Sequence, residues 1–131
     1  RLRPVSAVMR KGEMLPLLRA PAKLQAALAV MSETPGRPGC ALLVDEKDHL
    51  LGIFTDGDLR RLVSLGKADL EGDLSHHVTA QPTTLDPDDR VQDAEAILSA
   101  SSLDQAPVLD RNHRVVGLVD VQDLLGDPPE A

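Results

Sequence analysis

Residues 51–61 read LGIFTDGDLRR, an apolar strand sequence that runs directly into a helix start. Residues 50–54 have the length and the branched and aromatic side chains of a buried strand. Thr55 and Asp58 stand three apart at the junction, a spacing typical of the first turn of a helix. The stretch therefore predicts a strand, a junction and a helix in succession.

The same pattern recurs 65 residues later, so the chain contains an internal repeat. Asp45, Gly52, Asp58 and Leu59 are matched by identical residues at positions 110, 117, 123 and 124. Upstream the match continues at a shift of 67, and the two-residue difference falls in the Pro/Gly-rich stretch 34–39. A repeat of this kind predicts two copies of one supersecondary unit.

Each half has the pattern of a helix, two strands joined by a polar turn, and a closing helix. Apolar residues recur at helical spacing over 24–31 and 91–98, where Asp88 and Asp89 are expected to begin the second of these helices. Short apolar runs at 41–44, 50–54, 106–109 and 114–119 predict strands, and the closing helices are expected to end at Gly66 and Gly126. We therefore predict an α/β fold of two units, residues 1–66 and 67–131, packed with pseudo-twofold symmetry and dimerising through the remaining apolar helix faces.

Composition excludes several classes of function. The 131-residue chain has a net charge of −7, no long basic run and one aromatic residue, Phe54, so neither a phosphate-tracking surface nor a stacking platform for nucleic acid is expected.

Cys40 is alone, which excludes a disulfide framework and favours a buried structural thiol in a reducing, cytoplasmic setting. His76 and His77 are adjacent and cannot face the same way on a strand, so no metal is expected. No apolar stretch reaches the roughly 18 residues of a membrane span, and the N-terminus has no signal-peptide core, beginning as though cut from something longer.

The first strand–helix junction has the chemistry of a phosphate and ribose site. Backbone N–H groups over 56–58, from Asp56 onward, are expected to face a phosphate, with the Thr55 hydroxyl as an added donor. The Asp58 carboxylate can accept two hydrogen bonds from vicinal ribose hydroxyls, and Gly52 would let a flat base or sugar approach the strand. Arg60 and Arg61, one turn further on, could reach a ligand carboxylate or phosphate.

A purely structural interpretation stands beside this one. Thr55 and Asp58 also satisfy the general form of a capping box, in which the two side chains serve only to begin the helix.

The strand, Gly52, Thr55 and Asp58 together resemble the signature that closes a cystathionine-β-synthase (CBS) motif, and the two copies resemble a tandem CBS pair. That resemblance implies a regulatory module that binds nucleotides in the cleft between its repeats, with Lys11 in a loop that passes near the base or sugar. More narrowly, GIFTDGDLRR and the upstream MRKGEMLPLL resemble the C-terminal CBS pair of arabinose 5-phosphate isomerases of the Kdo pathway of lipopolysaccharide synthesis.

In that family a separate sugar-isomerase domain precedes the pair and carries the catalysis, and nothing in this chain resembles it. The resemblance makes CMP-Kdo the leading ligand, through feedback by the activated end-product, and an adenine nucleotide the second.

The second copy departs from the pattern. Asp120 replaces Thr55 and Gln122 replaces Gly57, so the junction would repel a phosphate and only Asp123 remains as a possible ribose contact. We expect this half to be a structural partner.

Two hypotheses follow. The chain is either a ligand-sensing module of an isomerase or a structural pair that mediates oligomer assembly without a ligand. Independent catalysis is not expected, because no nucleophile–base pair and no spaced general acid and base can be assembled from these residues.

Overall fold

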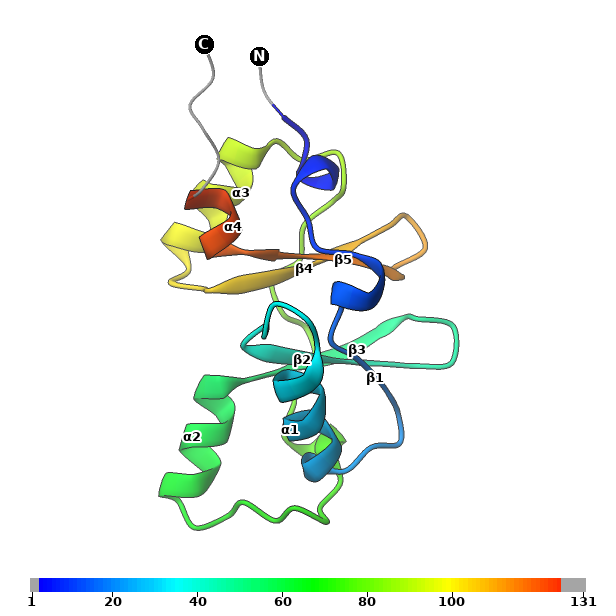
Figure 1. Ribbon diagram of the computed structural model, residues 1–131, viewed down its shortest axis with the longest axis vertical. Coiled ribbons are helices and arrows are strands. Elements are labelled where there is room, and N and C mark those ends of the chain that lie inside the picture. The colour runs from blue at the N-terminus through cyan, green and yellow to red at the C-terminus, as the bar shows by residue number, and fades with distance from the viewer. Residues whose placement is uncertain (1–2, 126–131) are drawn as a thin grey trace. The chain divides into compact units, whose positions relative to one another are not determined.

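The computed structural model describes residues 3–125, which form two compact units (Figure 1). The central unit is residues 16–82; the split unit combines residues 3–15 with residues 83–125. The central unit contains β1 (Leu17–Arg19), α1 (Leu24–Glu33), β2 (Cys40–Val44), β3 (Leu50–Thr55), α2 (Asp56–Ser64) and the 3-10 turn η3 (Leu74–His76). The split unit contains the 3-10 turns η1 (Val5–Ala7) and η2 (Gly12–Met14), then α3 (Val91–Ala100), β4 (Gln105–Leu109), β5 (Val115–Asp120) and α4 (Val121–Leu125).

The predicted helix–strand–strand–helix order is confirmed in both halves, as α1-β2-β3-α2 and α3-β4-β5-α4. Residues 3–15 group with the second repeat rather than the first, so the compact units have other bounds than the motifs 1–66 and 67–131. That division stays a proposal about the sequence repeat.

The two sheets repeat each other strand by strand. In the central unit β2 and β3 pair antiparallel, β1 lies parallel to β2, and Thr79 bridges Ile53 on the other edge. In the split unit β4 and β5 form the matching hairpin, Leu85 takes the place of β1 against Val108, and Arg10 bridges Leu118. The chain that crosses each hairpin edge therefore comes from residues 78–79 in one unit and from residues 9–10 in the other.

The polar turns of the two hairpins are stabilised in the same way, by the side chain of an aspartate. Asp45 Oδ1 accepts hydrogen bonds from the backbone N–H groups of Lys47 and His49, at 2.8 and 2.9 Å. Asp110 Oδ1 accepts the same two bonds from residues 112 and 114, at 2.8 and 3.0 Å. An Asx-type turn needs a short acceptor side chain at this position, which explains why both repeats have aspartate there.

Each unit has a cluster of buried apolar residues beneath its helices. In the central unit α1 covers the hairpin, with Phe54 fully buried at the centre, and the cluster comprises Leu24, Ala27, Met31, Ala41, Leu43, Phe54 and Leu74. In the split unit it comprises Val5, Leu85, Ala94, Leu98, Ala106, Val108, Val119 and Leu124. Cys40 is buried, as expected.

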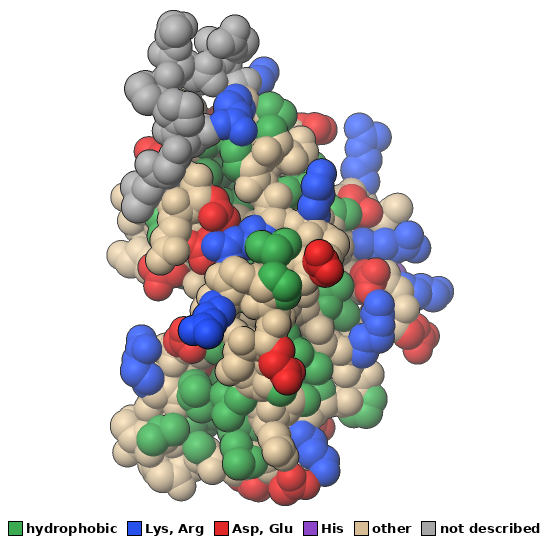
Figure 2. All heavy atoms as spheres, in the orientation of Figure 1, with side chains coloured by type: hydrophobic (Ala, Val, Ile, Leu, Met, Phe, Trp, Pro, Cys, Tyr) green, Lys and Arg blue, Asp and Glu red, His purple; other side chains and the backbone are tan. Residues whose placement is uncertain are grey.

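Helix α2 contributes little to these clusters. None of its residues is buried; Leu59 and Leu62 are only partly covered, and Val63 and the following Leu65 have exposed fractions of 61% and 59%. In Figure 2 hydrophobic side chains gather at the surface over the part of the view where Figure 1 places α1 and α2.

The start of α3 differs from the sequence prediction, and the predicted end of α4 is not described. Helix α3 begins at Val91 rather than at Asp88 or Asp89, because those residues form a turn in which Asp89 Oδ2 and Asp86 Oδ1 accept backbone N–H groups. The expected end of α4 at Gly126 lies outside the described residues. Within residues 3–125 no helix is long and apolar enough to cross a membrane.

Candidate functional site

The junction between β3 and α2 is a complete capping box. Thr55 lies in extended conformation before the helix, and its Oγ1 accepts the backbone N–H of Asp58 at 3.2 Å. Asp58 Oδ2 in turn accepts the backbone N–H of Thr55 at 2.9 Å. The capping box that the spacing predicts is therefore formed, and any ligand must use the atoms that the box leaves over.

Two atoms of the box remain able to bind a ligand. The Thr55 hydroxyl accepts one bond and still has its own hydrogen to donate. Among the described residues, Asp58 Oδ1 accepts from Arg61 Nη1 alone, at 3.0 Å, in an ion pair whose arginine side chain is 67% exposed. Exposed pairs of this kind contribute little free energy, so a ligand hydroxyl can replace or share the contact.

The backbone donors expected for a phosphate are reduced to one. The Asp56 N–H donates to Gly39 O at 3.0 Å, and the Asp58 N–H is held by Thr55. Of the three backbone N–H groups of residues 56–58, the one of Gly57 is left without a partner among residues 3–125. The expectation that the amides of 56–58 act together is thus corrected to a single donor.

Gly52 has a packing role instead of the expected role in ligand approach. A Cβ built on it would lie 2.8 Å from Thr79 O and within contact of the Val78 side chain. The space above the strand is therefore filled by the chain that crosses the hairpin edge, which requires a residue without a side chain at this position.

A cavity of about 420 Å³ lies beside the first residue of α2, and it is lined by Met31, Ser32, Arg37, Pro38 and Asp56. Arg37 is exposed and adopts a left-handed backbone conformation, with φ of 45°. Sequence reasoning missed this residue because nothing in the stretch 34–39 marks it except its turn composition. Arg60 is exposed on α2, and Lys11 is exposed at the start of η2 in the split unit, where their ligand roles stay predictions.

The second junction is closed by an internal ion pair. Asp120 Oδ1 accepts the backbone N–H of Gln122 at 2.9 Å, as expected for a capping aspartate. Asp123 Oδ2 and Oδ1 accept Arg10 Nε and Nη2, at 2.8 and 3.3 Å. The expected ribose contact at Asp123 is therefore already occupied by a guanidinium, a partner 113 residues away that no local pattern indicated.

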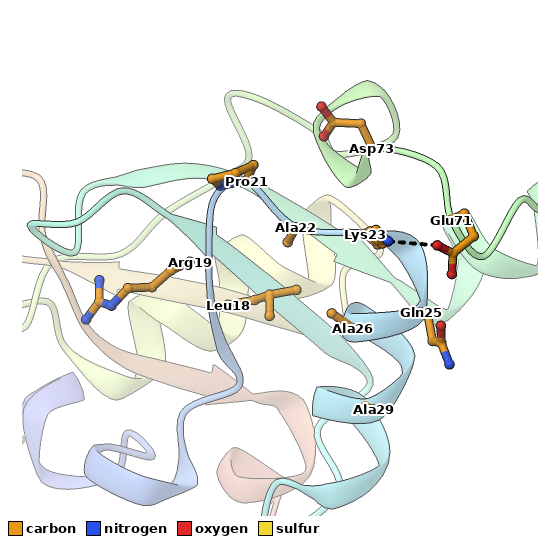
Figure 3. Close-up of a pocket in the computed structure, with 10 residues that line it drawn as sticks. All are labelled: Leu18, Arg19, Pro21, Ala22, Lys23, Gln25, Ala26, Ala29, Glu71 and Asp73. Atoms are coloured by element: carbon orange, nitrogen blue, oxygen red, sulfur yellow. Dashed lines mark hydrogen bonds and ion pairs between the residues drawn. The ribbon is translucent and has the colours of Figure 1, made fainter.

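A second cavity, of about 660 Å³, lies along α1 in the central unit (Figure 3). Its lining includes the small side chains of Ala22, Ala26 and Ala29. At its rim Lys23 Nζ pairs with Glu71 Oε1 at 2.7 Å, and this hydrogen-bonded pair raises the pKa of Lys23 above its ordinary value.

Asp73 is the second acidic residue of the rim. The backbone N–H of Ser75 donates to its carboxylate and lowers the pKa of Asp73. Sequence reasoning did not single out this groove, which is formed by residues of two separate segments, 18–29 and 71–73.

Comparison with known proteins identifies the motif. The family model described as CBS domain matches residues 5–65 and again residues 72–128. Arabinose 5-phosphate isomerase GutQ of Escherichia coli is 33% identical over 93% of this chain, and KdsD of Francisella tularensis is 28% identical over 92%. The chain spans 37% and 36% of the length of these two relatives.

Solved structures agree with the fold. The CBS domain protein PAE2072 of Pyrobaculum aerophilum, in complex with AMP, has a TM-score of 0.83 at 20% identity, covering 95% of this chain and 92% of that one. The CBS domain pair of MJ0100, in complex with 5′-methylthioadenosine and S-adenosyl-L-methionine, has the same TM-score at 21% identity, covering 95% and 94%. Two matches to the family model, one in each repeat, show that the chain belongs to the CBS domain family and is a tandem CBS pair.

Proposed function

We propose that this chain is the nucleotide-sensing regulatory module of an arabinose 5-phosphate isomerase. The observation that carries the proposal is the β3–α2 junction, where Asp58 Oδ1, the hydroxyl hydrogen of Thr55 and the Gly57 N–H take no part in the bonds of the capping box. The curated relatives support the isomerase context, and the catalysis would belong to a sugar-isomerase domain elsewhere in the parent protein.

Each of these residues would contact a different part of the ligand. Asp58 would accept a ribose hydroxyl, with its ionised carboxylate strengthening the bond. The Thr55 hydroxyl and the Gly57 N–H would donate to a phosphate at the positive end of α2. Arg61, and Arg60 beside it, would turn from the exposed ion pair to the phosphate, since a bidentate arginine–phosphate contact is stronger than a solvated surface pair.

The ligand is either a cytidine sugar nucleotide or an adenine nucleotide. Feedback by the end-product of the pathway favours CMP-Kdo, whereas the AMP complex of PAE2072 favours an adenine nucleotide. With Phe54 as the one aromatic residue and fully buried, stacking on a ring cannot select the base, so backbone groups and apolar contacts must do so.

Thermal unfolding with added ligand tests the proposal. A ligand that binds only the folded chain stabilises it by about 2.7 kcal/mol at one hundred times its dissociation constant, so CMP-Kdo should raise the melting temperature and AMP should do so less. The Asp58→Ala variant should lose most of this shift. If neither compound changes the melting temperature of the wild-type chain at millimolar concentration, the sensing function is wrong.

The second candidate function is assembly without a ligand, and the exposed residues of the central unit favour it. Val63 and Leu65 form an apolar ridge at the end of α2, and the groove of Figure 3 has a floor of small side chains on α1. Acidic Glu71 and Asp73 stand at the groove, while basic side chains flank the ridge. Ridge and groove would complement each other in a homodimer, in which each copy inserts its ridge into the other's groove.

Sedimentation tests whether the chain forms this homodimer. The wild-type chain should sediment as a dimer at micromolar concentration, and Val63→Glu should shift it to a monomer, because a charge would enter an apolar interface. Glu46→Lys, a charge change in an exposed turn outside the ridge and the groove, is the control and should leave the dimer intact. A wild-type chain that stays monomeric at high micromolar concentration would refute the dimer.

A further inference from the structure

The two junctions of the repeat use the same aspartate for different purposes. Asp58 binds its own helix start through one oxygen and an exposed arginine through the other. Asp123, at the matching position, gives both oxygens to Arg10, whose side chain is only 12% exposed. The internal repeat therefore contains one junction whose carboxylate contacts an exposed arginine and one whose carboxylate contacts a largely buried arginine, while the carboxylate side chains themselves are 17% exposed at Asp58 and 30% exposed at Asp123.

Arg10 is held in place by its backbone. Its N–H donates to Leu118 O at 2.8 Å, and the Leu118 N–H donates to Arg10 O at 3.0 Å, so the residue is fixed beside the last residues of β5. Met9 packs in the space above Gly117. Because the backbone is already ordered, the guanidinium reaches Asp123 with little further loss of conformational entropy.

The guanidinium also balances the charge of this junction. Its Nη2 lies 3.8 Å from Asp120 Oδ2, and Asp120 is a buried carboxylate with an exposed fraction of 7%. A phosphate that entered here would meet Asp120, and a ribose diol would have to displace Arg10 and leave a buried cation without its bidentate partner. Both steps are unfavourable.

Within residues 3–125, the first junction has no such internal cation. Thr79 holds the position in the central unit that Arg10 holds in the split unit, since it bridges Ile53 as Arg10 bridges Leu118. Its side chain is uncharged, and the cation that does contact Asp58 comes from an exposed side chain of α2. The two junctions therefore differ by threonine against arginine at this position, as well as by Thr55 against Asp120 at the helix start.

We infer that Arg10 is the specificity-determining residue of the pair: it occupies the second junction in place of a ligand and limits the chain to one nucleotide, bound at Thr55 and Asp58. This inference rests on the proposed nucleotide-binding function and assigns that function to one of the two repeats.

Equilibrium dialysis with AMP tests it on the full chain. The wild-type chain should bind one AMP, and Asp58→Ala should weaken binding by at least about tenfold. In the Asp58→Ala background, adding Arg10→Leu with Asp120→Asn should restore binding to within about tenfold of wild type. This pair of changes removes one positive and one negative charge, so the net charge of the junction is kept. The side-chain amide introduced by Asp120→Asn retains a carbonyl oxygen that can still accept the Gln122 N–H.

The matched control is Asp120→Asn alone in the same Asp58→Ala background. Arg10 still holds Asp123 in this variant, so it should bind AMP no more tightly than Asp58→Ala alone. The inference would be overturned if the control bound AMP as tightly as the variant lacking Arg10. It would also be overturned if the wild-type chain had two equal sites, or if a folded variant lacking Arg10 bound no AMP.

Two further outcomes are decisive. If the variant lacking Arg10 does not fold, the wild-type stoichiometry decides: one site that is lost with Asp58→Ala supports the inference, and two sites overturn it. A wild-type chain that binds neither AMP nor CMP-Kdo would overturn the proposed function and the inference together. A wild-type chain that binds nucleotide, with a folded variant lacking Arg10 that does not, would overturn the inference alone.

Discussion

Replacing Gly52 by alanine should destabilise the chain much more than replacing Gly117, its counterpart in the other repeat. At Gly52 the new Cβ would lie 2.8 Å from Thr79 O and 2.8 Å from Val78 Cβ. Neither atom can move easily, because Thr79 exchanges two backbone hydrogen bonds with Ile53, at 3.0 and 2.9 Å, and a β-branched side chain has one preferred rotamer. Overpacking of this kind costs about 1–3 kcal/mol.

At Gly117 the new Cβ meets the side chain of Met9, with Cγ at 2.8 Å. Methionine has three rotatable bonds and can repack, so Gly117→Ala should cost less than about 1 kcal/mol. Gly57→Ala is the control, since its Cβ would only reach ordinary contact with Thr55 Oγ1 at 3.6 Å, and alanine favours the helix.

Urea denaturation followed by far-ultraviolet circular dichroism measures all three variants, because the chain has no Trp or Tyr for fluorescence. The reasoning is refuted if Gly52→Ala unfolds at the wild-type midpoint but no longer binds AMP. That result would assign the space above Gly52 to a ligand rather than to the crossing chain.

Three further changes have defined outcomes. Thr55→Val removes the cap of α2 and should lower the free energy of unfolding by about 0.5–2 kcal/mol in urea titration, whereas Thr55→Ser should keep most of it. Burial raises the pKa of Asp45, but hydrogen bonds from the backbone of His49 and Lys47 outweigh it and hold the pKa below its usual 3.8. The stability advantage of wild type over Asp45→Asn should therefore be present at neutral pH and disappear as the pH falls below about 4, and an advantage that grows on acidification would contradict this sign. Phe54→Ala should cost about 3–5 kcal/mol in the same titration, since the ring is fully buried at the centre of the central unit, and a loss below about 1 kcal/mol would contradict that placement.

The fold was predictable because the local patterns that determine helices, strands and turns occur twice in the sequence. Apolar periodicity marked the helices, short apolar runs marked the hairpins, and the matched Asp45 and Asp110 marked their turns. Strand β1 was missed because three residues between two prolines are too few to show a period. Its place beside β2 depends on a parallel pairing with residues 25 positions further along, which no local pattern expresses.

The candidate site was predictable only in part. The Thr55 and Asp58 spacing identified the junction, but which amides were already paired depended on Gly39, and the closing of the second junction depended on Arg10. Both partners come from distant segments that tertiary structure brings together. Gly52 was recognised as a position of close approach, yet the approaching group is the chain itself.

Calorimetric titration of AMP into the wild-type chain, Asp58→Ala and Asp123→Ala tests the central claim most directly. The account predicts that Asp58→Ala weakens binding by about 1.5–3 kcal/mol, the loss typical of a charged hydrogen bond, while the fold survives. Asp123→Ala should weaken it much less, because that carboxylate binds Arg10 and not the ligand. Equal losses for the two variants, or a loss confined to Asp123→Ala, would contradict the account.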